Sequence, residues 1–141
     1  MSAIIILLLM ATLMSVVAKV AFESVKHTSD TYMQERARLF LRSVMENSLM
    51  AIEGYERNST NKCLKSINFT DESGMFYANV EILRYYCYDL NRCPCDGDIV
   101  KKIDTPFSQG YVLMKITVES NLSNPRVTKK IVIKQTTLQR P

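Results

Sequence analysis

Four cysteines are the residues of this sequence whose spacing most constrains their chemistry. They are Cys63, Cys87, Cys93 and Cys95, and none of them lies in the apolar N-terminal segment. In a small exported domain, an even number of cysteines predicts disulfide bonds. Cys93 and Cys95 are too close in sequence to pair comfortably with each other. We therefore expect each of them to bond to one of Cys63 and Cys87, in an order that the sequence leaves open.

Zinc binding and redox catalysis are the alternative uses of such cysteines, and the spacing favours neither. The stretch Cys93-Pro94-Cys95 lacks the two-residue gap that zinc knuckles, thioredoxin-type motifs and haem attachment sites share. The single histidine, His27, is remote from the cysteines and is interpreted as a residue on a helix surface. It has no serine or cysteine motif to pair with, so the sequence predicts no catalytic site.

Acidic, glycine and tyrosine residues offer little further chemistry. Asp96-Gly97-Asp98 could give its carboxylates to calcium, but calcium takes about six to eight oxygen ligands and the tripeptide is also a common turn. The four glycines are scattered, so they form no phosphate-binding loop. Tyr85, Tyr86 and Tyr88 are interpreted as packing around the disulfides rather than as a partner surface. We expect no metal, no cofactor and no enzymatic activity.

Glycosylation is the modification for which the sequence does carry signals. The acceptor pattern Asn-x-Ser/Thr occurs at Asn58, Asn68 and Asn121. At Asn58 and Asn121 an acidic residue also stands two places upstream, namely Glu56 and Glu119, which looks like the extended acceptor sequence of bacterial N-glycosylation. Both asparagines fall in predicted loops, where an acceptor has to be. Asn58 and Asn121 are therefore candidate sites for a glycan.

The elements that position these residues begin with an apolar segment. No charged residue lies between Ser2 and Ala18, and the segment extends through Lys19 to Phe22. Roughly twenty helical residues span ~30 Å, which matches the hydrocarbon core of a bilayer if Lys19 snorkels to the interface. The segment therefore predicts a membrane-spanning helix.

Three interpretations of this segment compete. A cleaved secretory signal and a plain signal anchor both need basic residues before the apolar run, and only Met1 and Ser2 precede Ala3. The nearest positive charges, beginning with Lys19, lie on the other side. We therefore expect a processed or trimmed form whose basic leader has been removed on the cytoplasmic side, so that the apolar helix remains in the final protein.

An amphipathic helix is predicted to follow the apolar segment. The first glycine is Gly54 and the first proline is Pro94, so no helix breaker interrupts the preceding residues. Thr28-Ser29-Asp30 could cap a separate second helix, but we favour one helix that reaches about Tyr55. Apolar residues recur along it at steps of three and four; they include Met33, Ala37, Phe40, Leu41, Val44, Ala51 and Ile52.

Alternating apolar residues predict a small β-sheet after the helix. Period-two patterns run through residues 76–82, 112–118 and 127–133, with a short edge strand at residues 99–103. Residues 63–68 are interpreted as an irregular or helical piece. The sheet has one apolar face, and the amphipathic helix is long enough to cover it. The sequence therefore predicts an α+β fold, in which a long N-terminal hydrophobic-then-amphipathic helix packs on a small antiparallel sheet of three to four strands.

This order of elements resembles the type IV pilin and type II secretion pseudopilin family. The likeness covers the whole chain in architecture, and the stretch KHTSDTYMQERARLFLRSVMENSLMAIEGYER resembles pilin-like proteins found beside such systems in bacteria. The family usually carries a glutamate as its fifth mature residue, where this chain has Ile5, and the usual Phe-Thr-Leu-Ile-Glu opening is absent. Either Met1 is not the mature first residue, or the chain is one of the minor subunits that lack the glutamate.

The resemblance implies a structural function. It divides the chain into an apolar transmembrane or filament-core helix (residues 1–23), an amphipathic continuation (24–57) and a disulfide-containing β head (58–141). The subunit is expected in the inner membrane before assembly, and then in an extracellular filament or a periplasmic pseudopilus. There it would form a homo-oligomer or a mixed filament with other pilin-like subunits. The alternative is a single-span, membrane-anchored periplasmic or surface binding module that does not polymerise.

The charge of the chain gives no sign of a nucleic-acid partner. The net charge of +4 is far from the basic excess of nucleic-acid-binding proteins. After Glu119 the charged residues are all basic, and they are Arg126, Lys129, Lys130, Lys134 and Arg140. We interpret this run as a solvated or edge strand whose lysines discourage pairing with other chains, rather than as an anion or partner site.

Overall fold

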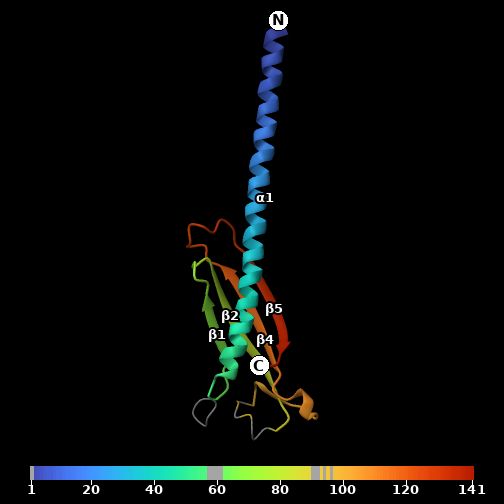
Figure 1. The fold of residues 1–141 in the computed structure, drawn as a ribbon, viewed down its shortest axis with the longest axis vertical. Coiled ribbons are helices and arrows are strands. Elements are labelled where there is room, and N and C mark those ends of the chain that lie inside the picture. The colour runs from blue at the N-terminus through green and yellow to red at the C-terminus, as the bar shows by residue number, and fades with distance from the viewer. Residues whose placement is uncertain (1, 57–61, 90–92, 94, 96) are drawn as a thin grey trace. The chain divides into compact units, whose positions relative to one another are not determined.

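The described part of the chain consists of one long helix, five strands and a short 3-10 helix (Figure 1). The computed structural model describes residues 2–56, 62–89, 93, 95 and 97–141. The α+β class predicted from the sequence is confirmed. In chain order the elements are α1 (Ser2–Glu53), β1 (Ser66–Thr70), β2 (Phe76–Cys87), β3 (Val100–Lys102), the 3-10 helix η2 (Pro106–Ser108), β4 (Val112–Ser120) and β5 (Val132–Gln139).

The chain divides into two compact units, and α1 contributes residues to both. The first unit is Met1–Arg36 and the second is Ala37–Pro141. Because α1 is continuous through Thr28-Ser29-Asp30, one helix is confirmed and a capped second helix is not formed there. The helix ends just before Gly54, as expected from the poor helix propensity of glycine.

The first unit exposes its apolar side chains over residues 3–29. Every residue from 3 to 29 is exposed. Two hydroxyls of its uncharged part are satisfied by the helix backbone, since Thr12 donates to the Leu9 carbonyl at 2.9 Å and Ser15 to the Thr12 carbonyl at 2.8 Å. By length and composition alone, α1 is long and apolar enough to cross a membrane.

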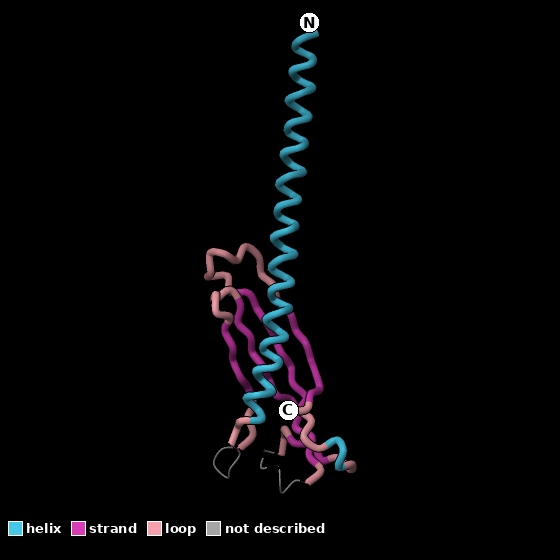
Figure 2. Tube along the Cα trace, viewed as in Figure 1, coloured by secondary structure: helices cyan, strands magenta, loops and turns pink. Residues whose placement is uncertain are grey.

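The strands form one sheet in the second unit (Figure 2). Four of them are antiparallel in the order β1-β2-β4-β5. The short β3 was correctly predicted as a strand. It pairs with Tyr85–Cys87 of β2 in the parallel direction, unlike the other four strands. The sheet thus has five strands, one more than the largest number that the sequence predicts.

The strand β1 corrects the interpretation of residues 63–68 as irregular or helical. It pairs along its whole length with β2. Only Ile67 and Phe69 are apolar in β1, so its alternation is too short to stand out in the sequence. The turn at residues 71–74 sets the pairing, because Gly74 adopts a φ of 65°, a conformation that favours glycine.

Two side-chain hydrogen bonds hold the turn at residues 71–74 in place. The Asn121 side-chain amide donates to the Gly74 carbonyl at 3.0 Å, and the Asn124 side-chain amide donates to the Ser73 carbonyl at 3.0 Å. Both asparagines come from the loop that follows β4. The two loops at this end of the sheet are therefore joined by side-chain hydrogen bonds.

The core lies between one face of the sheet and the part of α1 that belongs to the second unit (Figure 1). The rings of Phe40 and Phe76 meet there with their centroids 6.3 Å apart, and the predicted packing of helix on sheet is confirmed. Within the second unit, the buried helix residues recur at steps of three and four, and they are Ala37, Leu41, Val44, Ser48 and Ile52. The buried strand residues alternate, and they include Phe76, Ala78, Val80, Ile82, Val112, Met114, Ile116 and Val118.

The last strand begins later than the sequence predicts. It is Val132–Gln139 rather than residues 127–133. Ser120 at the end of β4 explains the difference, because its hydroxyl donates to the Lys129 carbonyl at 3.2 Å and accepts from the Ile131 N–H at 2.8 Å. Such side-chain bonds compete with strand pairing. β5 lies at an edge of the sheet, as the lysine-rich run predicts.

Truncation of Phe76 should strongly destabilise the second unit. Its ring is fully buried, so Phe76→Ala leaves a cavity and should lower the free energy of unfolding by about 3–5 kcal/mol. The adjacent Tyr77 faces away from the core and is 43% exposed, and Tyr77→Ala should cost less than about 1 kcal/mol. Denaturant unfolding of the full chain in detergent measures both values. Equal costs would contradict the assignment of the two sheet faces.

Candidate functional site

Both disulfides lie where β2 ends. They join Cys63 to Cys95 and Cys87 to Cys93, with Cα–Cα distances of 4.8 and 6.5 Å. The expectation that Cys93 and Cys95 bond to different partners is confirmed, and the connectivity that the sequence left open is now known. With all four cysteines bonded, none of them is a thiol that could bind zinc or attack a substrate.

A β-bulge in β2 directs Tyr85 and Cys87 toward the core. The register with β4 shifts between Ile82 and Arg84, so one extra residue, Leu83, enters the strand. Without this insertion, the alternation that buries the first half of β2 would place Tyr85 and Cys87 on the solvent face. They are instead 3% and 2% exposed. The bulge therefore sets the direction from which Cys87 meets Cys93.

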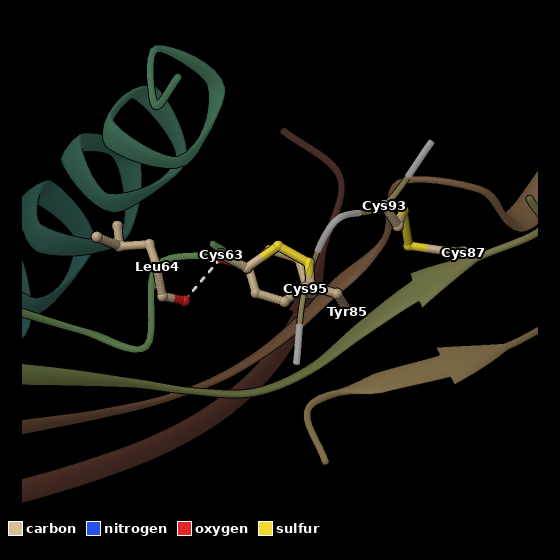
Figure 3. The surroundings of a disulfide bond; sticks show 6 residues. All are labelled: Cys63, Leu64, Tyr85, Cys87, Cys93 and Cys95. Atoms are coloured by element: carbon tan, nitrogen blue, oxygen red, sulfur yellow. Dashed lines mark hydrogen bonds between the residues drawn. A yellow bond between two sulfur atoms is a disulfide. The ribbon is translucent and has the colours of Figure 1, made fainter. Parts of the chain in front are cut away.

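Tyr85 connects the end of β2 to the segment that carries Cys63. Its hydroxyl donates to the Leu64 carbonyl at 2.9 Å, which Figure 3 shows as a dashed line. Its backbone N–H donates to the Ile99 carbonyl at 2.7 Å, just before β3. Together with the disulfides, these bonds hold segments that are far apart in the sequence at one end of the sheet.

The tyrosines near this end have different environments. Tyr85 is buried, Tyr86 is half-buried and Tyr88 is 44% exposed, so core packing describes Tyr85 but not Tyr88. Tyr86 also lines, with Tyr55 and Tyr111, a hollow of about 380 Å³ beside the Cys87–Cys93 disulfide. Sequence reasoning misses this hollow because Tyr55 and Tyr111 are isolated residues that only the fold brings together.

Of the candidate glycan sites, Asn121 can be placed and Asn58 lies outside the described residues. The side-chain nitrogen of Asn121, the atom that a glycan would modify, donates to the Gly74 carbonyl, and its oxygen accepts from the Ser123 N–H at 3.1 Å. Because the amide nitrogen has two N–H groups and keeps one after glycosylation, the bond to Gly74 does not by itself exclude a glycan. Asn68 lies in β1, where its oxygen accepts from the Asn79 amide at 2.7 Å. Glycosylation of Asn58 and Asn121 stays a prediction.

The part of the chain that the structure describes contains no cluster of metal ligands. No group of three or more His, Cys, Asp or Glu side chains there could hold a metal ion. Within Asp96-Gly97-Asp98, Asp96 lies outside the described residues. His27 is exposed on α1, with its Nδ1 3.4 Å from the Thr31 hydroxyl, as predicted for a residue on a helix surface. That the chain is not an enzyme remains a prediction.

Removal of the Cys63–Cys95 bond should destabilise the second unit more than removal of Cys87–Cys93. A disulfide restricts the unfolded chain, and the effect grows with the length of the loop that it closes. The sequence separations are 32 and 6 residues. We expect losses of about 3–4 and about 2 kcal/mol for the double alanine variants C63A/C95A and C87A/C93A. Denaturant unfolding compares them, and the reverse order would contradict a role through the unfolded chain.

Comparison with known proteins adds no assignment. No protein-family model, curated protein or solved structure matches this chain. A function therefore has to be inferred from the exposed apolar helix of the first unit and from the compact, disulfide-linked second unit.

Proposed function

We propose that this chain is a structural subunit of a type IV pilus-like or pseudopilus filament and that it assembles through the N-terminal part of α1. The subunit is anchored in the inner membrane before assembly. It then joins an extracellular filament or a periplasmic pseudopilus, with its own copies or with other pilin-like subunits. The chain acts by packing rather than by catalysis.

The observation that carries the proposal is the exposure of apolar side chains all around the first unit. Residues 3–18 are uncharged, and every one of them is exposed. A helix that is apolar on all sides needs an apolar environment on all sides. Lipid provides that environment before assembly, and neighbouring copies of the helix provide it in a filament. Because lipid is itself apolar, the transfer between the two is driven by packing.

The hydroxyls of Thr12 and Ser15 in the apolar segment are also compatible with an apolar environment. Thr12 and Ser15 both donate to carbonyls of their own helix. Neither side chain therefore brings an unsatisfied polar group into lipid or into a bundle of helices. The first charged residue after the segment is Lys19, whose long side chain can reach the interface.

The second unit supports a location outside the cytoplasm. Its two disulfides persist in oxidising compartments and are rare in the cytosol. The sheet face away from α1 is polar and solvated, and it carries a cross-strand ion pair between Lys115 and Glu81 at 3.6 Å. Such an exposed pair contributes little to stability, but it keeps this face suited to contact with water.

Electron microscopy of material sheared from the cell surface, with mass spectrometry of its subunits, tests the proposal. We expect filaments that contain this chain with its apolar helix retained. A chain that stays monomeric in the membrane and never enters filaments would refute polymerisation and favour the single-span binding module. The same peptide analysis would detect glycans on Asn58 and Asn121.

A further inference from the structure

We propose that the second unit binds an organic ammonium group in the hollow beside the Cys87–Cys93 disulfide. The hollow has a volume of about 380 Å³, which is within the usual size of small-molecule sites. Its lining includes the acidic residue Glu53 and four tyrosines, Tyr55, Tyr85, Tyr86 and Tyr111. The ligand class is a compact alkylated amine such as a trimethylammonium group. This inference does not depend on filament assembly.

The backbone fixes two of the aromatic residues opposite each other. The Tyr86 N–H donates to the Tyr111 carbonyl at 2.8 Å, and the Gly110 N–H donates to the Tyr86 carbonyl at 3.0 Å. These bonds continue the pairing of β2 with β4 beyond Val112. Gly110 has a φ of 88°, which favours glycine and turns the chain into β4. Tyr86 and Tyr111 are thus positioned by the sheet and not by a long loop.

The electrostatics of the hollow favour a cation. Among the described residues that line it, Glu53 is the one with a charged side chain, and that charge is negative. Glu53 is also the last residue of α1, where the helix dipole has its negative end and the last carbonyls lack helical partners. Aromatic faces attract cations as well. Three independent features therefore act in the same direction.

A second hollow near the end of β2 has a different combination of tyrosine and charged residues. It is lined by Tyr88 together with Asp89 and Asp104, but it also contains Lys102. That hollow has a single tyrosine, and the lysine ammonium offsets part of the charge of its two carboxylates. The hollow beside Cys87–Cys93 has four tyrosines and no cationic side chain among the described residues that line it, so it is the better site for an ammonium group.

A titration with a ligand and its neutral isostere tests the proposal. The full chain is held in a maltoside detergent, which has no ammonium headgroup, and is titrated with choline or with 3,3-dimethylbutan-1-ol. Choline should shift the amide resonances of Gly110 and Tyr111 and bind roughly tenfold more tightly than the alcohol. Equal binding of the two probes, or no shift with choline, would overturn the proposal.

Variants locate the site and separate binding from folding. Tyr111→Leu should weaken choline binding roughly fivefold or more, and Glu53→Gln should weaken it and reduce its dependence on salt. The matched control is Tyr77→Leu, because Tyr77 is an exposed tyrosine of β2 that does not line this hollow, and choline binding should be unchanged. Glu53 is exposed, so its variant keeps the test valid if Tyr111→Leu unfolds. Unchanged choline affinity in Glu53→Gln would contradict the site.

Discussion

A chain shortened to begin at residue 58, and therefore without α1, is expected to aggregate, whereas a chain that begins at Ser24 should fold as a soluble monomer. The shorter chain loses the buried helix face that contains Leu41, Val44 and Ile52. The inner side chains of β2 and β4 are then open to water. A contiguous apolar patch of that kind promotes association. The longer chain keeps the cover and lacks only the most apolar part of α1.

Size-exclusion chromatography with light scattering measures this difference, and circular dichroism checks the fold. Both truncated chains contain all four cysteines, so they can be refolded under the same oxidising conditions. The disulfides are thereby the same in the two samples. If the chain that begins at residue 58 is monomeric and as stable as the longer one, the helix is not part of the core of the second unit. The fold would then be a domain on a separate stalk.

The helix and the central strands can be predicted from the sequence because their patterns are long. No glycine or proline precedes Gly54, and the apolar steps of three and four give the buried face of α1 directly. In β4 the residues Val112, Met114, Ile116 and Val118 alternate regularly, and all four are buried. In each case one face of the element is buried and the other is in water, so the pattern of hydrophobic residues is enough to predict the structure.

The edges of the sheet cannot be predicted in the same way, because contacts from other segments determine them. β1 becomes a strand by pairing with β2, although only Ile67 and Phe69 in it are apolar. β5 starts late because the hydroxyl of Ser120 forms hydrogen bonds with the backbone of the preceding segment. The bulge around Leu83 likewise leaves no mark in the local pattern.

At the candidate site, too, local features can be predicted from the sequence, whereas contacts between distant segments cannot. That Cys93 and Cys95 do not pair with each other is a matter of short-range geometry, so the sequence predicts it. Which of them meets Cys63 depends on the bulge and on the path from β2 to β3, so only the fold decides it. The hollow beside the Cys87–Cys93 disulfide depends on several separate chain segments that the fold brings together, and no single segment carries a signal for it.

Replacement of Leu8 by lysine is expected to exclude the chain from filaments. Leu8 lies within the uncharged run of α1 and is exposed, so under the proposed function its environment is lipid or neighbouring subunits. A lysine near the middle of a membrane helix costs about 3 kcal/mol, which is more than about a hundredfold in an equilibrium constant. In a packed bundle of helices the same charge would also have to be buried without a partner. The penalty recurs for every subunit added.

A matched control separates the position of the charge from the charge itself. Leu122 has a similar exposure in the loop after β4, where a lysine faces water, so Leu122→Lys should leave assembly unchanged. Mass spectrometry gives the share of each variant in sheared filaments relative to the membrane, and intact disulfides show that the second unit has folded. Lipid can accommodate a lysine by snorkelling, whereas a helix bundle has no such route to water. The Leu8→Lys chain should therefore be lost from filaments even where some of it remains in the membrane. Filaments that contain it in the normal proportion would mean that α1 does not polymerise the subunit.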